Sequence, residues 1–172
     1  MSNHKTRLSE FQAKATLRGR VDLVGPLLKS LPAQLAGAIL AVDGGHALPG
    51  FKADFSIGDG DSHPPGLEAN LDISLPRDKD ASDLTHALEL IPQSVEEVHL
   101  HGFWGARLDH QMMNQGSLFH FLQTSKARVS IHTLGKDQLL AFPAGTHTLN
   151  IESVFSLWSL QLAYFTRQGA CA

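Results

Sequence analysis

The chain has 172 residues, which is the length of one domain with at most a small appendage. Its net charge of -3 and its 18% of charged residues argue against the strongly basic surface of a nucleic-acid or anionic-membrane binder. The single cysteine, Cys171, allows no disulfide within the chain, and no segment has the apolar length of a signal peptide or a membrane span. We therefore expect a cytoplasmic protein with no nucleic-acid or membrane partner.

Short apolar runs alternate with helical patterns along the first two thirds of the chain. Residues 1–17 read as a polar leader with scattered charges. The runs 21–24 and 38–42 predict strands that are covered on both faces, and 98–102 predicts a third. Between the first two runs, Pro32 leaves room for only a short helix.

Two helices are predicted between and after these strands. The first ends before Pro92, because four apolar residues recur at helical spacing: Leu84, Ala87, Leu88 and Ile91. The second covers about 108–123, where Arg107, His110 and Asn114 form a polar stripe beside an apolar one.

From about residue 126 only strand-like segments follow, separated by Gly, Asp and Asn. The sequence therefore predicts an α/β domain over 18–124, with a mostly parallel sheet and flanking helices in a Rossmann-like arrangement. A β-rich segment is expected to follow over 125–172.

Polar clusters follow the predicted strands or open the predicted helices. They are Asp43-Gly44-Gly45, the turn GDGDS at 58–62, the segment RDKDASD at 77–83 and the segment RLDH at 107–110. In open α/β sheets, ligands bind beyond the carboxyl ends of the strands. Neighbouring carboxylates repel one another unless a cation neutralises them, and Mg²⁺ combines one or two carboxylates with substrate phosphates. Because no P-loop pattern occurs, a phosphate site here must be of another type.

Each cluster taken alone has a simpler interpretation. An Asp-Gly pair is a common turn, Asp80 or Ser82 could be only a helix cap, and Arg107 with Asp109 could be a surface pair. These simpler interpretations would have to hold four times, each at the end of a predicted element. The four clusters together therefore favour a binding site.

Two histidines raise a separate metal question. His99 and His101 are two residues apart, so in a strand they share one face. No cysteine lies nearby in sequence, which favours a structural or solvent-contacting pair over a pair of zinc ligands.

The order VDGG, GDGDS, KDASD and GARLDH, with Asn114 after the last motif, resembles the catalytic domain of thiamin pyrophosphokinase. That family has DGG, GDFDS, KDxTD and GGRxDH followed by Asn. The departures are Gly60 for Phe, Ser82 for Thr and Ala106 for Gly. The resemblance implies transfer of a pyrophosphoryl group from ATP to thiamin, giving thiamin diphosphate and AMP, by a homodimer with active sites at the subunit interface.

The resemblance also assigns residues. It implies Mg²⁺ ligands at Asp59, Asp61 and Asp83, with Asp43 and Asp80 in the same pocket. Phosphate contacts are expected from Lys79 and Arg107, and the group nearest the acceptor hydroxyl is Asp80 or Asp109. Nucleotide contacts are expected from Asp43, Gly44, Gly45, Lys79, His110 and Asn114. The 125–172 segment resembles a shortened form of the family's thiamin-binding sandwich.

Three hypotheses of different classes follow from these residues. The first is a thiamin pyrophosphokinase. The second is a divalent-metal hydrolase, or a pyrophosphokinase acting on a different small alcohol, because DxD turns also serve those reactions. The third is a module that binds the nucleotide or thiamin without turnover.

Overall fold

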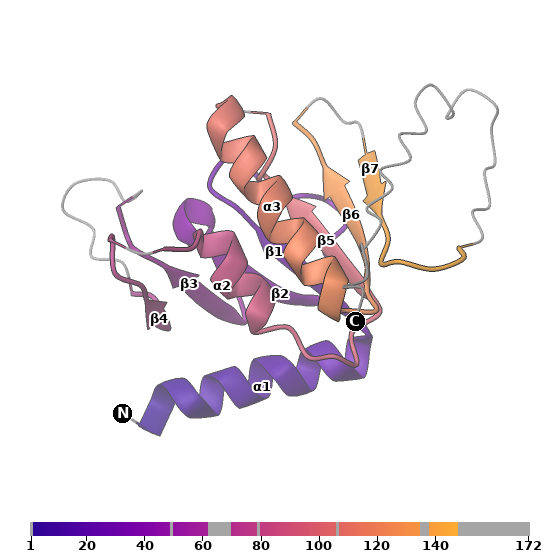
Figure 1. Cartoon of the computed structure of the whole chain (residues 1–172). Helices are drawn as coiled ribbons and strands as arrows, with labels where there is room; N and C mark the ends of the chain where they lie inside the picture. The colour runs from indigo at the N-terminus through magenta and orange to yellow at the C-terminus, as the bar shows by residue number, and fades with distance from the viewer. Residues whose placement is uncertain are drawn as a thin grey trace, which may run out of the picture.

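The protein is represented by a computed structural model that describes residues 2–48, 50–61, 70–78, 80–105, 107–134 and 138–147. Its helices are α1 (Ser2–Arg18), the 3-10 helix η1 (Asp43–Ala47), α2 (Asp83–Glu89) and α3 (Leu108–Thr124). Its strands are β1 (Arg20–Val24), β2 (Ala38–Val42), β3 (Phe55–Gly58), β4 (Ile73–Ser74), β5 (Glu97–His101), β6 (Arg128–His132) and β7 (Gln138–Ala141). Figure 1 shows one sheet, with α2 and α3 in front of it and α1 along its lower end.

The seven strands lie in the order β4-β3-β2-β1-β5-β6-β7. Each pair from β4 to β6 is parallel, and only β7 runs antiparallel to its neighbour β6. The predicted α/β class with a mostly parallel sheet is confirmed. Because the strands are parallel, the carboxyl ends of β2, β3 and β5 meet at one edge of the sheet, and polar side chains that follow them gather there.

The two faces of the sheet differ in chemistry because side chains alternate along each strand. One face carries the apolar core together with residues of the helices: Val21, Leu23, Leu40, Phe55, Leu100, Ile131, Leu84, Leu88, Leu118 and Phe121. The opposite face carries buried polar groups: Asp22, Ser56, His101 and Ser130. The segment 25–36 forms turns and bends with no helix, and it reaches the polar face through the backbone N–H of Ala36, which donates to Asp22.

The segment expected as a polar leader forms helix α1, which packs against the sheet. Phe11 is only 1% exposed, and its ring stacks on Phe55 with centroids 5.9 Å apart. Leu8, Phe11 and Ala15 follow at i, i+3 and i+7, so a narrow apolar stripe was present in a segment that is otherwise polar. Lys14 pairs with Asp54 just before β3, which places α1 along the edge where the strands begin (Figure 1).

The expected domain boundary after residue 124 falls between helix α3 and strand β6. Two of the strand-like segments expected after residue 126 form β6 and β7, and they belong to the same sheet as β1. Later segments of the expected thiamin-binding part lie outside the described residues. Within the described part of the chain, no helix is long and apolar enough to cross a membrane.

Candidate functional site

Asp43 lies where β2 ends and opens the 3-10 helix η1 in an uncommon backbone conformation. Its φ is +51°, a left-handed value that asparagine and aspartate adopt more readily than other non-glycine residues. Two glycines allow the turn to pack closely. A Cβ on Gly58 would lie 2.8 Å from the Cα of Asp43, and one on Gly45 would lie 2.0 Å from the carbonyl oxygen of Val24. The glycines therefore seat η1 against the ends of β1 and β3.

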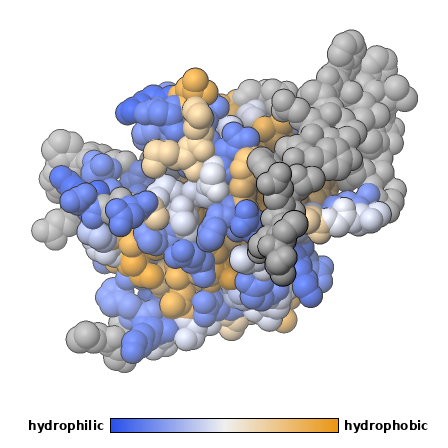
Figure 2. All heavy atoms as spheres, viewed as in Figure 1, coloured by the Kyte–Doolittle hydropathy of each residue, from blue (hydrophilic) through white to orange (hydrophobic). Residues whose placement is uncertain are grey.

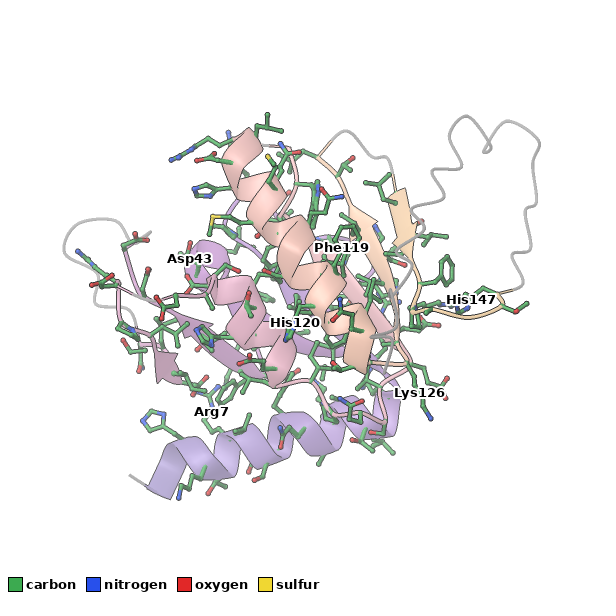
Figure 3. The ribbon with its side chains drawn as sticks, viewed as in Figure 1. Arg7, Asp43, Phe119, His120, Lys126 and His147 are labelled. Atoms are coloured by element: carbon green, nitrogen blue, oxygen red, sulfur yellow. The ribbon has the colours of Figure 1, made fainter. Side chains whose placement is uncertain are left out.

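Asp59 and Asp83 approach Asp43 from two other elements. Asp59 directly follows β3, and its Oδ1 accepts a hydrogen bond of 3.2 Å from the backbone N–H of Asp61. Asp83 is the first residue of α2, and Ser82 caps that helix by accepting a hydrogen bond of 3.1 Å from the N–H of Thr85. Figure 3 shows Asp43 beside the start of α2.

One carboxylate oxygen from each of these three aspartates lies within 4.8 Å of the other two. We call Asp43, Asp59 and Asp83 the carboxylate triad. All three residues are half-buried, and Oδ1 of both Asp43 and Asp83 is shielded from solvent. Like charges held this closely repel one another, and a hard divalent cation with oxygen ligands would neutralise them. This set of donors fits Mg²⁺.

The triad differs from the expected metal ligands at one position. Two of the expected ligands, Asp59 and Asp83, lie in the triad. Asp61 lies outside it, and Asp43 takes the third place. Asp61 is exposed on the GDGDS turn and contributes its backbone N–H to Asp59. Asp43 joins the group because its backbone conformation and its contact with Gly58 are set by packing between β2 and β3, which spacing along the chain does not reveal.

A trio of hydroxyl groups fixes the start of α2 against α3. Ser117 Oγ lies 3.0 Å from Ser82 Oγ and 2.7 Å from Thr85 Oγ1. Ser82 is therefore the helix cap that the sequence offered as an alternative role, and Ser117 holds that cap in place. Ser117 was not among the predicted residues, because nothing in the local pattern of α3 connects it to a residue more than 30 positions earlier.

The remaining candidate residues lie outside the triad. Arg107 and Asp109 are exposed and form an ion pair through both carboxylate oxygens. The hydrogen bonds and charge of Asp109 raise the pKa of Arg107, and the hydrogen bonds from Arg107 lower the pKa of Asp109. This is the surface pair that the sequence also allowed. His110 is likewise exposed, at the first turn of α3.

Three further candidates have distinct surroundings. Asn114 donates a hydrogen bond of 2.9 Å from Nδ2 to the carbonyl oxygen of Phe103, which ties α3 to the loop after β5. Asp80 is exposed shortly before α2, and Gly44 lies within η1. Lys79 lies outside the described residues.

Comparison with known proteins identifies the family. The sequence profile of "Thiamin pyrophosphokinase, catalytic domain" matches residues 33–131, which is more than half of the chain and includes the carboxylate triad. The chain belongs to the thiamin pyrophosphokinase family. No curated protein sequence matches it.

Two solved structures of the family resemble this one. The thiamin pyrophosphokinase from Geobacillus thermodenitrificans has a TM-score of 0.51 and 26% identity, over 65% of this chain and 58% of that one. The thiamine pyrophosphokinase from Bacillus subtilis has a TM-score of 0.48 and 21% identity, over 65% of this chain and 59% of that one. The chain thus matches less than two thirds of the length of either structure.

Proposed function

We propose that this chain is a thiamine diphosphokinase that transfers the terminal pyrophosphoryl group of ATP to the hydroxyl of thiamin, in a reaction that requires Mg²⁺. The products are thiamin diphosphate and AMP. The observation that supports this most directly is the carboxylate triad, gathered within 4.8 Å at the carboxyl edge of the sheet and inside the region that matches the family. Ligands of open α/β sheets bind at this edge.

The triad would hold the metal ion in this proposal. Asp43, Asp59 and Asp83 offer three oxygens from three different elements, and this donor set suits a hard cation. Bound Mg²⁺ would supply positive charge against the polyphosphate. Asp61 remains part of the proposed site as an exposed residue on the same turn, where its backbone N–H donates to the ligand Asp59.

The other proposed contacts follow the family motifs. Pyrophosphoryl transfer asks a protein mainly for positioning and charge stabilisation. Arg107 is suited to a phosphate, because its guanidinium already makes two parallel hydrogen bonds to Asp109 and a phosphate accepts the same pattern. The remaining proposed residues are Lys79 for phosphate, Asp80 or Asp109 near the acceptor hydroxyl, and Gly44, Gly45, His110 and Asn114 around the nucleotide.

The test is AMP release from ATP and Mg²⁺ by the full chain, with and without thiamin, together with mass detection of thiamin diphosphate. We expect AMP only when thiamin is present. Asp83→Asn should lower the rate by a factor on the order of 10² to 10³. Removing one group that stabilises charge in a transition state usually has an effect of this size. Glu89→Gln is the matched control, because Glu89 lies in the same helix at its opposite end and is 59% exposed, so its rate should be unchanged.

Other outcomes would reject the proposal in distinguishable ways. AMP release at the same rate without thiamin would indicate a hydrolase. ATP binding with no AMP release under any condition would indicate a binding module. Full activity in both Asp59→Asn and Asp83→Asn would show that the carboxylate triad is not needed for the reaction, and that the GDGDS segment is only a turn.

We also propose a cytoplasmic homodimer, which the family resemblance suggests. Three large apolar side chains at the start of α3 are exposed, Leu108, Met112 and Met113, and Figure 2 shows apolar atoms at this end of the helix. A dimer interface would cover such residues. Light scattering of the full chain should give twice the mass of one chain, and the mass of a single chain at assay concentrations would reject the dimer.

A further inference from the structure

Three histidines gather on the polar face of the sheet, away from the carboxylate triad. His99 and His101 belong to β5, and the parallel register places His132 of β6 directly opposite His101. One ring nitrogen from each lies within 4.8 Å of the other two. We propose that His99, His101 and His132 form a binding site for a first-row divalent transition ion such as Zn²⁺. We call them the histidine triad.

The distances among the rings suit a metal. His99 Nδ1 lies 2.9 Å from His132 Nε2, and the rings of His101 and His132 stack with centroids 4.3 Å apart. Zinc bonds imidazole nitrogen at about 2.0–2.1 Å, which places tetrahedral ligands roughly 3.3 Å from one another. The three rings are nearly parallel, with interplanar angles of 10° to 18°, so the rings must turn about their Cβ–Cγ bonds to direct three nitrogens at one ion.

Carboxylates orient two of the three rings. Asp22 is fully buried, and its Oδ1 lies 3.2 Å from His101 Nε2. Glu97 Oε2 lies 3.4 Å from His99 Nε2. An ionised carboxylate only accepts hydrogen bonds, so Nε2 of both rings faces a hydrogen-bond acceptor, and Nδ1 is the nitrogen left for a metal. Carboxylates that hold imidazole ligands in this way are a regular feature of zinc sites.

The charges that surround the histidine triad are balanced. Arg20 pairs with Asp22, and Arg128 pairs with Glu97, so both of these nearby cations have an anionic partner.

The number of ligands indicates an open site. Three protein ligands leave one position of a tetrahedral ion for water or another small ligand. The side chain of His99 is 12% exposed, so solvent reaches the group. His132 lies one residue beyond the part of the chain that matches the family profile.

Zinc binding to the full chain, stripped of metal, is the test. Zn²⁺ is titrated in competition with a chromophoric chelator, and excess Mg²⁺ is present to occupy the carboxylate triad. We expect one equivalent of Zn²⁺ to bind the wild type, and His132→Gln to weaken binding by more than the roughly 10–100-fold that loss of an outer partner costs. His120→Gln is the matched control, because His120 is exposed on α3 (Figure 3) and should leave Zn²⁺ binding unchanged.

Two further measurements keep the proposal open to rejection. His99→Gln repeats the test at a second ligand, with circular dichroism to confirm the fold of both variants. Co²⁺ added to the wild type should give the intense visible absorption of a four-coordinate site with nitrogen ligands. The proposal is overturned if Zn²⁺ binds His132→Gln or His99→Gln as tightly as wild type, or if the Co²⁺ spectrum shows only weak octahedral bands.

Discussion

Replacing Asp43 by asparagine should stabilise the fold without Mg²⁺ and remove much of the stabilisation that Mg²⁺ brings. The substitution keeps the shape of the side chain and removes its charge. Asparagine also tolerates the φ of +51° at this position, so the backbone conformation is retained. The change therefore isolates the electrostatic contribution of Asp43 to the carboxylate triad.

The magnitude follows from the distances. Two unit charges 4.8 Å apart repel by about 1 kcal/mol at the dielectric constant of water, and by about 3 kcal/mol at an effective value near 20. Neutralising Asp43 removes two of the three repulsive pairs. Because the triad is half-buried and reached by solvent, we take the lower figure and expect a gain of about 2 kcal/mol in the free energy of unfolding.

Urea unfolding at pH 7, with and without Mg²⁺, measures both effects. An ion that binds only the folded state stabilises it by about 2.7 kcal/mol at 100 times its dissociation constant. Wild type should gain stability as Mg²⁺ is added, and Asp43→Asn should gain much less. Asp61→Asn is the matched control from the same acidic region, because Asp61 is exposed and lies outside the triad.

Three results would refute this reasoning. Asp43→Asn could lose stability in the absence of Mg²⁺, which would mean that the carboxylate contributes contacts that outweigh the repulsion. It could respond to Mg²⁺ as wild type does, which would remove Asp43 from the group of ligands. Asp61→Asn could instead lose the response, which would restore Asp61 to the position that the sequence alone assigned to it.

Three further substitutions test how the fold supports the site. Phe11→Ala should lower the free energy of unfolding by roughly 3–5 kcal/mol, because Phe11 is buried in the core. Leu17→Ala, at an 87% exposed position of the same helix, should change it by less than about 0.5 kcal/mol. Equal losses for the two variants in urea titrations would show that α1 is not part of the core. Gly45→Ala should cost roughly 1–3 kcal/mol by the same measurement, because its Cβ overlaps the carbonyl oxygen of Val24, and an unchanged midpoint would contradict the close packing of η1. Ser82→Ala should cost about 1 kcal/mol through loss of the helix cap, and a cost near zero would mean that the cap is not needed to hold α2.

The sequence by itself determined the elements whose signals are local. A few neighbouring residues are enough to recognise the apolar runs of β1, β2 and β5 and the apolar stripe of α2. The spacing of apolar residues in such a segment indicates whether it is a strand or a helix and which of its side chains are buried. The ordered motifs indicated the family, and they placed Asp59 after a strand and Asp83 at the start of a helix. The prediction that both residues belong to one site rests on these motifs.

Helix α1 shows the limit of such patterns. Its apolar stripe is narrow and most of its side chains are polar, so composition indicated a leader. What decides its place is the contact of Phe11 with Phe55, and that contact exists only after the sheet has formed.

Tertiary structure alone decided which side chains meet. Asp43 enters the carboxylate triad through a left-handed backbone and a close approach to Gly58, and His132 joins His99 and His101 only through the register of β6 against β5. Residues far apart in the chain are brought together by strand pairing and turn geometry. Hydrophobic periodicity indicates on which face of a strand or helix a side chain lies. The pairing of strands determines which side chains from other strands lie next to it, and a ligand site is formed by such adjacent side chains.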